Sequence, residues 1–315
     1  MGFFKMNAIG IDIGGTFIKG AVVTPKGDIQ DFFTLPVESG ETPEETINKL
    51  IIQIKKINYP NINGVGIGCP GTVDSDTGVV EFAPNIGWTN VHIKEMIEKA
   101  LDLPVHITND ANAAASGEAT FGVAKQLHNI VVLTLGTGVG GGLVLDGKLY
   151  EGNEGKGAEI GHMVIEIDGR PCGCGRHGCL ETYASATALI TDTKKQMEQH
   201  PDSLMWKGIT SLDEVDAKVA FSAAKIGDRY AQEVVRNYIH YLGEGILNLC
   251  NIFRPDAVIL CGGVSKEGGY LTSRLKNYCE ERSYGFPHSP TVEILVGKLG
   301  YNAGVVGAAS LFFKQ

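Results

Sequence analysis

The stretch Ile11-Asp-Ile-Gly14-Gly-Thr-Phe-Ile-Lys-Gly20-Ala-Val-Val23 is matched later in the chain by Leu133-Thr-Leu-Gly136-Thr-Gly-Val-Gly-Gly-Gly142-Leu-Val-Leu145. The two stretches align without gaps at a constant offset of 122 residues. Each has the pattern of a strand, a glycine turn and a second strand. Glycine turns expose backbone N–H groups and let a phosphate approach closely. Two copies predict two similar domains that face one another, whereas the alternative is a chance match between two common hairpins.

The rest of the chain alternates strand-like and helical patterns, which is typical of α/β proteins. Strand-like runs occur at residues 7–13, 17–23, 64–69, 104–108, 130–135, 142–146 and 257–261. Helical patterns occur at residues 43–57, 182–199, 214–226, 228–252 and 303–313. The first helix carries the clearest start signal: Thr42 and Glu45 form a capping box, and Pro43 takes the first helical position. The pattern predicts an α/β protein long enough for two domains.

Composition excludes several classes of protein. The formal net charge is −9, which opposes a nucleic-acid-binding surface. No apolar run reaches the roughly 18 residues of a membrane span, and residues 1–9 lack a secretory layout, so we expect a cytoplasmic protein with no membrane partner. The seven cysteines have no regular spacing, which favours a reducing compartment. Four of them are expected to be core residues: Cys69, Cys250, Cys261 and Cys279.

A histidine and three cysteines lie close together in the sequence. His162, Cys172, Cys174 and Cys179 fall within eighteen residues. Zinc prefers four tetrahedral nitrogen and sulfur ligands, which these side chains could supply. The Cys-x-Cys spacing is tight, and glycines at 173 and 175 allow the backbone to fold around an ion. The stretch predicts a zinc site.

The glycine run has a second interpretation. Gly136-x-Gly138-x-x-Gly141 fits the dinucleotide-binding pattern, but that pattern must open a helix, and here a strand follows. A nicotinamide-dependent oxidoreductase is therefore disfavoured, and two tight hairpins without a ligand remain an alternative. Gly262 and Gly263 follow the strand at 257–261, where a nucleotide base could bind.

Asp110 is the candidate catalytic residue. It follows the strand at 104–108 and precedes Ala111-Asn-Ala-Ala-Ala-Ser, which favours a helix. A helix N-terminus stabilises negative charge, and a carboxylate held there can accept a proton from a hydroxyl. Asn109 or Asp110 could equally serve as a helix cap, and the two roles are compatible.

Taken in order, these motifs resemble the ROK family of sugar kinases and repressors along essentially the whole chain. The motifs are Asp12-Ile-Gly-Gly-Thr16-x-x-Lys19, Asn109-Asp110, Leu135-Gly-Thr-Gly-Val-Gly-Gly-Gly142, Glu159-Ile-Gly-His162 and Cys172-x-Cys174-Gly-x-x-Gly-Cys179. Pro84-Asn85-Ile86-Gly87-Trp88 adds a similarity to the bacterial glucokinases of that family. One departure is Ala158, where the family often has glycine.

The resemblance implies a duplicated actin/hexokinase-like fold of the ribonuclease H-like type, with a cleft between its domains. It implies a small domain of residues 1–115 with a C-terminal helix at 302–315, and a large zinc-carrying domain of residues 116–301. It implies phosphorylation of a hexose at its 6-hydroxyl by ATP, with glucose as the expected substrate, Asp110 as general base and Mg²⁺ as cofactor. A homodimer or larger homo-oligomer is expected by analogy.

The resemblance also implies three sets of binding residues. The sugar would contact Asn85, Asn109, Asp110, Glu159, His162 and Glu181. The phosphates and Mg²⁺ would face Asp12, Gly14, Gly15, Thr16, Lys19, Gly136, Thr137 and Gly138, with Gly262 and Gly263 on the adenosine side. Structural zinc would be held by His162, Cys172, Cys174 and Cys179, and would also position Glu159 and Glu181.

Two other functions within the family are alternatives. An N-acetylmannosamine or N-acetylglucosamine kinase would share most sugar contacts and differ around C2, near Gly71 and Thr72. A sugar-sensing repressor would carry an N-terminal helix-turn-helix domain, for which the early position of Asp12 leaves no room in this sequence.

Overall fold

The computed structural model describes residues 6–38, 40–289 and 291–313, and it divides into two compact units. Unit 1 comprises Met1–Ile130, Gly142–Ala158 and Lys298–Gln315, and unit 2 comprises Val131–Gly141 and Glu159–Gly297. Helix α3 (Asp110–Thr120) is continuous across residue 115, where the small domain was expected to end. The predicted domain boundaries stay a prediction.

The first sheet has the strand order β3-β2-β1-β4-β8. Its strands are β1 (Asn7–Ile13), β2 (Phe17–Val23), β3 (Ile29–Pro36), β4 (Ile62–Cys69) and β8 (Val105–Asn109). Strand β2 runs antiparallel to both β1 and β3, whereas β1, β4 and β8 are parallel. The β1–turn–β2 hairpin predicted around Gly14 is therefore confirmed, and its turn lies beside the carboxyl ends of β4 and β8.

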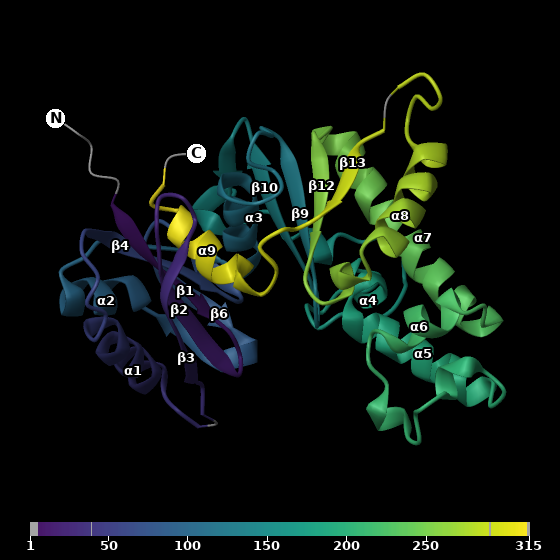
Figure 1. Ribbon diagram of the computed structural model, residues 1–315, viewed down its shortest axis with the longest axis horizontal. Coiled ribbons are helices and arrows are strands. Elements are labelled where there is room, and N and C mark those ends of the chain that lie inside the picture. The colour runs from purple at the N-terminus through teal and green to yellow at the C-terminus, as the bar shows by residue number, and fades with distance from the viewer. Residues whose placement is uncertain (1–5, 39, 290, 314–315) are drawn as a thin grey trace. The chain divides into compact units, whose positions relative to one another are not determined.

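The two faces of this sheet bury different side chains, because successive residues of a strand point to opposite faces. Ile9 and Ile11 of β1 pack into one apolar cluster with side chains of α1 (Pro43–Lys55) and α2 (Ile93–Leu101). Ala8 instead packs with Val305 and Ala309 of α9 (Ala303–Ser310). Helices thus cover both faces, as Figure 1 shows for the yellow helix α9 beside the purple strands β1 and β2.

Glycines let α9 lie directly on the sheet. A Cβ at Gly10 of β1 would stand 1.9 Å from the Val305 carbonyl oxygen, and one at Gly66 of β4 would stand 1.8 Å from that of Ala308. A Cβ at Gly307, within α9 itself, would stand 1.9 Å from the carbonyl oxygen of Ala113 in α3. No side chain fits at any of these three positions, so helix and sheet meet backbone to backbone.

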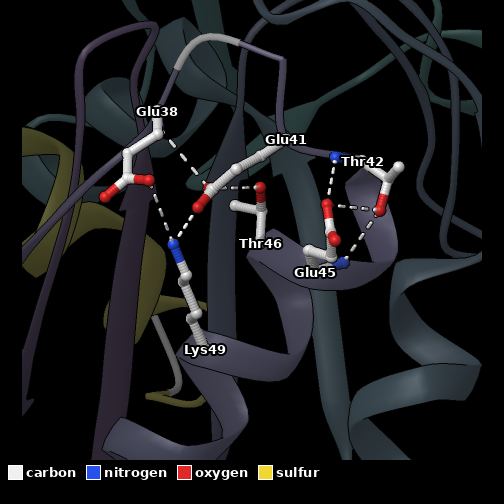
Figure 2. A network of polar contacts seen from close by, with 6 residues as sticks. All are labelled: Glu38, Glu41, Thr42, Glu45, Thr46 and Lys49. Atoms are coloured by element: carbon white, nitrogen blue, oxygen red, sulfur yellow. Dashed lines mark hydrogen bonds and ion pairs between the residues drawn. The ribbon is translucent and has the colours of Figure 1, made fainter.

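Helix α1 begins as its capping box predicts. The Thr42 hydroxyl accepts a hydrogen bond from the Glu45 backbone N–H (3.2 Å), and the Glu45 carboxylate accepts one from the Thr42 N–H (2.9 Å). Figure 2 shows this pair beside a second group, in which Lys49 reaches the carboxylates of Glu38 and Glu41. The first turn of α1 is therefore fixed by its own sequence.

The second five-stranded sheet repeats the topology of the first, with the order β11-β10-β9-β12-β13. Its strands are β9 (Ile130–Leu135), β10 (Val139–Leu145), β11 (Lys148–Tyr150), β12 (Ala257–Cys261) and β13 (Glu293–Val296). In each sheet two strands flank a glycine turn, the third extends the hairpin, and the last two add on the other side. The duplication predicted from the repeated stretch is confirmed at the level of strand order.

The remaining elements complete the two units. A small sheet has the order β5-β6-β7, with β5 (Thr72–Asp74), β6 (Val79–Ala83) and β7 (Trp88–Val91) in unit 1. Unit 2 carries α4 (Glu181–Ala184), α5 (Ala186–Gln199), α6 (Val219–Lys225), α7 (Arg229–Phe253) and α8 (Gly269–Arg282). The helix expected over 182–199 is split at Ser185, whose hydroxyl caps α5 by accepting from the Ala188 N–H. Within the described ranges, no helix is both long and apolar enough to cross a membrane.

Candidate functional site

In unit 1, Asp12, Asn109 and Asp110 lie at or just after the carboxyl ends of parallel strands. The register pairs Asp12 of β1 with Gly68 of β4, and Cys69 of β4 with Asn109 of β8. The Cys69 thiol is fully buried, and its pKa is raised first by burial and then by the charges of Asp110 and Asp12. Both carboxylates therefore lie close to one neutral thiol. Ligands of open α/β sheets bind at this edge.

Asn109 and Asp110 begin helix α3, as predicted. The Asn109 side-chain oxygen accepts a hydrogen bond from the Ala111 N–H (2.8 Å), which makes Asn109 the N-cap. Its amide group donates to the Gly71 carbonyl oxygen (3.1 Å) and so ties the helix start to the turn before β5. Asp110 is the first helical residue, and its Oδ1 also accepts from the Ala111 N–H (2.9 Å). The cap and the candidate base are thus adjacent residues whose side chains accept from the same backbone N–H.

The first glycine turn carries a charge pair. The Lys19 ammonium lies 3.2 Å from an Asp12 carboxylate oxygen and 4.1 Å from the centre of the Tyr301 ring. The backbone of Gly304 closes in from α9, since a Cβ there would stand 2.4 Å from the Asp12 carboxyl carbon. A Cβ on Gly15 would stand 3.4 Å from the Asn85 carbonyl oxygen. Four of the predicted phosphate and sugar residues are therefore neighbours within unit 1.

In unit 2, backbone hydrogen bonds hold the second glycine turn. The Gly136 N–H donates to the Gly138 carbonyl oxygen (3.0 Å). The start of α5 closes the turn from outside: the Ala186 N–H donates to the Gly136 carbonyl, and the Thr187 hydroxyl donates to the Thr137 carbonyl (2.7 Å). The turn is therefore anchored to an element about fifty residues downstream.

The third glycine turn, at Gly262 and Gly263, lies against the end of strand β9. Gly262 has φ +87°, a left-handed conformation that favours glycine, and a Cβ there would stand 2.5 Å from the Leu135 carbonyl oxygen. The Ser265 hydroxyl donates to the Gly262 carbonyl (2.8 Å). The turn after β12 therefore meets the end of β9 beside the second glycine turn, whereas Gly263 faces open space.

The predicted metal ligands converge in unit 2. One ligand atom from each of His162, Cys172, Cys174 and Cys179 lies within 4.8 Å of all the others. The Cys172 sulfur lies 3.5 Å from His162 Nδ1, and the Cys174 and Cys179 sulfurs lie 3.7 Å apart. A tetrahedral zinc with bonds of about 2.3 Å to sulfur requires ligand separations of about 3.8 Å. The cluster fits such an ion, with Nδ1 as the histidine ligand atom.

Arg170 braces the loop that carries these ligands, and sequence reasoning missed it. Its guanidinium binds both carboxylate oxygens of Asp192 (2.8 and 3.1 Å) and stacks on the Tyr183 ring, 4.6 Å from its centre. It also donates to the Thr182 carbonyl oxygen (3.1 Å). These partners lie 12 to 22 residues away, so no local motif marks them.

Two glutamates accompany the cluster. Glu181 Oε2 accepts a hydrogen bond from the Val139 N–H (3.0 Å), and its Oε1 lies 3.9 Å from the Cys172 sulfur. Burial raises the pKa of Glu159, His162 opposes this, and the Glu181 charge adds to it. Glu181 therefore spans from the histidine–cysteine cluster to the second glycine turn, a connection not expected from the sequence.

The predicted sugar residues fall into two groups. Asn85, Asn109 and Asp110 belong to unit 1, and Glu159, His162 and Glu181 belong to unit 2. The predicted nucleotide residues divide in the same way: Asp12 to Lys19 lie in unit 1, and the turns at 136–138 and 262–263 lie in unit 2. Each group is assembled within its own unit.

Glu151 is a further half-buried carboxyl that sequence reasoning missed. It accepts a hydrogen bond from the Thr108 hydroxyl, one residue before Asn109. Burial raises its pKa, and the Thr108 hydrogen bond only partly offsets this. An isolated glutamate in a polar loop gives no signal in the sequence.

Comparison with known proteins agrees with this geometry. The family model "ROK family" matches residues 8–315. The chain belongs to the ROK family. A glucokinase of Halalkalibacterium halodurans is 37% identical, over 98% of this chain and 95% of the relative. A xylose repressor of Caldicellulosiruptor bescii is 32% identical, over 98% of this chain and 78% of the repressor, so both branches of the ROK family are represented.

A solved structure extends the similarity to three dimensions. The ROK glucokinase of Streptomyces griseus, crystallised with glucose and AMPPNP, is 36% identical and superposes with a TM-score of 0.84. The alignment covers 97% of this chain and 98% of that one. The predicted actin/hexokinase-like fold of this ROK protein is thereby confirmed, and the cleft between its domains stays a prediction.

Proposed function

We propose that this protein transfers the terminal phosphoryl group of ATP to the 6-hydroxyl of glucose. Two findings support the choice of substrates: similar ROK proteins are glucokinases, and one of them was crystallised with glucose and an ATP analogue. The observation that carries the chemistry is the position of Asp110, at a strand end and at the first position of α3.

Asp110 is the general base in this proposal. The partial positive charge of the α3 N-terminus stabilises its carboxylate, and the hydrogen bond from Ala111 fixes the carboxylate's orientation. The carboxylate accepts the proton of the 6-hydroxyl as the oxygen attacks phosphorus. Phosphoryl transfer depends on such positioning and on charge stabilisation more than on covalent chemistry.

Further sugar ligands are proposed within each unit separately. Asn109 is pre-positioned by its contacts with Ala111 and Gly71, and Asn85 lies beside the first glycine turn. Glu159, His162 and Glu181 supply the contacts from unit 2. These roles rest on the ROK resemblance together with the local geometry of each group.

Zinc is the ion we propose for the cluster of His162, Cys172, Cys174 and Cys179, where it would supply structural rigidity. With Nδ1 bound to zinc, Nε2 would carry the ring proton and could donate to a sugar hydroxyl. Cys172 and Glu181 then lie side by side, so the ion also positions the neighbouring carboxylate.

The nucleotide is bound through the glycine turns. Backbone N–H groups at 14–16 and 136–138 would face its phosphates, and Gly262 its adenosine side. Asp12 and Lys19 place opposite charges at the first turn, suited to Mg²⁺ and to phosphate respectively. Mg²⁺ would offset negative charge on the transferred group.

The test is ADP release from Mg-ATP with glucose, mannose, fructose, N-acetylglucosamine and N-acetylmannosamine. We expect turnover on glucose. Asp110→Asn should lower kcat by about 10²- to 10⁴-fold and change the sugar KM little, because a positioned base acts on the chemical step. Asp213→Asn, an exposed aspartate in unit 2, serves as the matched control and should retain full activity.

Three outcomes have separate meanings. Full activity of Asp110→Asn would show that the base lies elsewhere. Turnover confined to an acetylated sugar would keep the mechanism and change the substrate. No turnover on any sugar by zinc-loaded protein would contradict the proposed activity.

A further inference from the structure

Unit 2 contains a cavity of about 590 Å³ between α6, α7 and α8. This volume lies within the usual range for small-molecule sites, about 300–1,000 Å³. None of its lining residues belongs to the sugar, nucleotide or zinc sets described above. The cavity therefore needs a separate explanation.

The cavity is basic, although the chain is acidic. Four cationic side chains line it, Lys225, Arg236, Arg274 and Arg282, against one carboxylate, Glu281. The chain as a whole has 36 acidic and 27 basic residues. Such a local reversal of charge is the electrostatic signature of an anion site.

Two of the four charges are already neutralised. Lys225 pairs with Glu267, and Arg282 lies 3.2 Å from Glu281. Among the residues that the structure describes, Arg236 and Arg274 have no carboxylate within 4.0 Å. The cavity thus presents two guanidinium charges without an acidic partner.

The walls of the cavity are pre-organised. The Arg274 guanidinium stacks on Tyr270, 3.4 Å from the ring centre, and its Nη1 donates to the Tyr270 carbonyl oxygen (3.1 Å). The Tyr278 hydroxyl donates to Glu244 (2.6 Å), and its ring lies on Gly243, where a Cβ would stand 2.4 Å from a ring carbon. Glycine within a helix is costly, and here it makes room for the tyrosine.

We propose that this cavity binds a small molecule bearing a phosphate group. A phosphate monoester carries a charge of about −2 near neutral pH, which matches the two uncompensated arginines. The planar guanidinium fork suits phosphate oxygens in pairs. Val235 and Ile239, with the tyrosine rings, offer apolar surface to the organic part of the ligand.

The experiment is calorimetric titration of the full chain with three probes: inorganic phosphate, pyrophosphate and glucose 6-phosphate. The wild type should bind at least one of them saturably. The double variant Arg236→Gln/Arg274→Gln should raise that Kd by about tenfold or more, since each lost charged hydrogen bond weakens binding substantially. Both arginines are exposed, so the variant should fold normally, which its melting temperature would verify.

Arg229→Gln is the matched control. Arg229 is an exposed arginine at the start of α7 that does not line the cavity, and its loss should leave the Kd within about twofold. Preference for glucose 6-phosphate would identify an organic phosphate as ligand, and equal binding of the inorganic probes would identify the phosphate group alone. Absence of binding, or binding unchanged in the double variant, would overturn the proposal. Glucose 6-phosphate is also the product of the proposed reaction, so only binding that is lost with the two arginines is assigned to the cavity, and binding that survives in the double variant is assigned to the proposed sugar site.

Discussion

A single backbone angle shows why glycine is favoured at position 158, where this chain departs from the family pattern and has alanine. Ala158, where the ROK family often has glycine, has φ +62°. This left-handed conformation brings a Cβ close to the carbonyl oxygen that follows and costs about 1–2 kcal/mol in residues other than glycine. Ala158 immediately precedes Glu159, so the strain lies beside a proposed sugar ligand. The effect of having alanine instead of glycine at this position can therefore be measured as a difference in stability.

We predict that Ala158→Gly stabilises the protein by about 0.5–1 kcal/mol. Relief of the strained φ should outweigh the greater freedom of glycine in the unfolded chain. Ala100→Gly, in the right-handed helix α2, is the control and should cost about 1 kcal/mol. Urea denaturation measures both changes. If Ala158→Gly lost as much stability as Ala100→Gly, the proposed backbone strain at Ala158 would be contradicted.

At the scale of elements, one side chain joins the histidine–cysteine cluster to the second glycine turn. Glu181 begins α4, lies beside Cys172 and accepts a hydrogen bond from Val139 at the start of β10. The Glu181 carboxylate occupies the space beside Gly138, where a Cβ would stand 2.1 Å from Oε2, so a side chain at that position would displace the carboxylate. The histidine–cysteine cluster, the proposed sugar ligand Glu181 and the second glycine turn are thereby linked within unit 2.

Removing zinc with a chelator should raise the Kd for glucose by about tenfold or more, since groups that orient ligands around a metal typically contribute factors of 10 to 100. The Kd for AMPPNP should change less, because backbone hydrogen bonds to Gly136 and Gly138 also hold the glycine turn. Calorimetry on zinc-free and zinc-reloaded protein would measure both constants. An unchanged glucose affinity without zinc would rule out the positioning role.

The sequence predicted local structure well where a complete motif was present. The capping box fixed the start of α1, and the tight cysteine spacing identified a cluster that does converge. Strands β5 to β7 were not predicted, because runs of three to five residues carry too little pattern. Arg170 and Glu151 were missed because their partners are distant in the sequence. Motifs can be read from neighbouring residues, whereas contacts between residues distant in the sequence form only when the chain folds.

At the scale of the whole molecule, the chain leaves unit 1, builds most of unit 2 and returns. Helix α9 contacts α3, β1 and β4, all in unit 1. The predicted small domain also joined a C-terminal helix to the N-terminal sheet, and it ended at residue 115. Since α3 continues to Thr120 and a Cβ on Gly117 would stand 2.9 Å from Gly307, we expect residues 116–120 to fold with α9.

Native-state hydrogen exchange tests this division. Amides of α3, α9 and β1 should become exposed together in one opening reaction, separate from that of α7 and β12, because helices packed backbone to backbone cannot open singly. Exchange of residues 116–120 together with α7 would instead support a boundary at 115. The Gly66→Ala variant offers a control, since it should accelerate the first opening and leave the second unchanged.

The glycine contacts of α9 also have a consequence for biosynthesis. Gly10 and Gly66 leave the ribosome well before the helix that covers them, at 303–310, is synthesised. During translation, residues 159–297 of unit 2 are synthesised before α9 and can fold first. One face of the first sheet therefore stays uncovered until α9 is made. A nascent chain stalled before α9 would leave that apolar face of the first sheet exposed, because no earlier segment in the described part of the chain supplies the contacts that α9 makes.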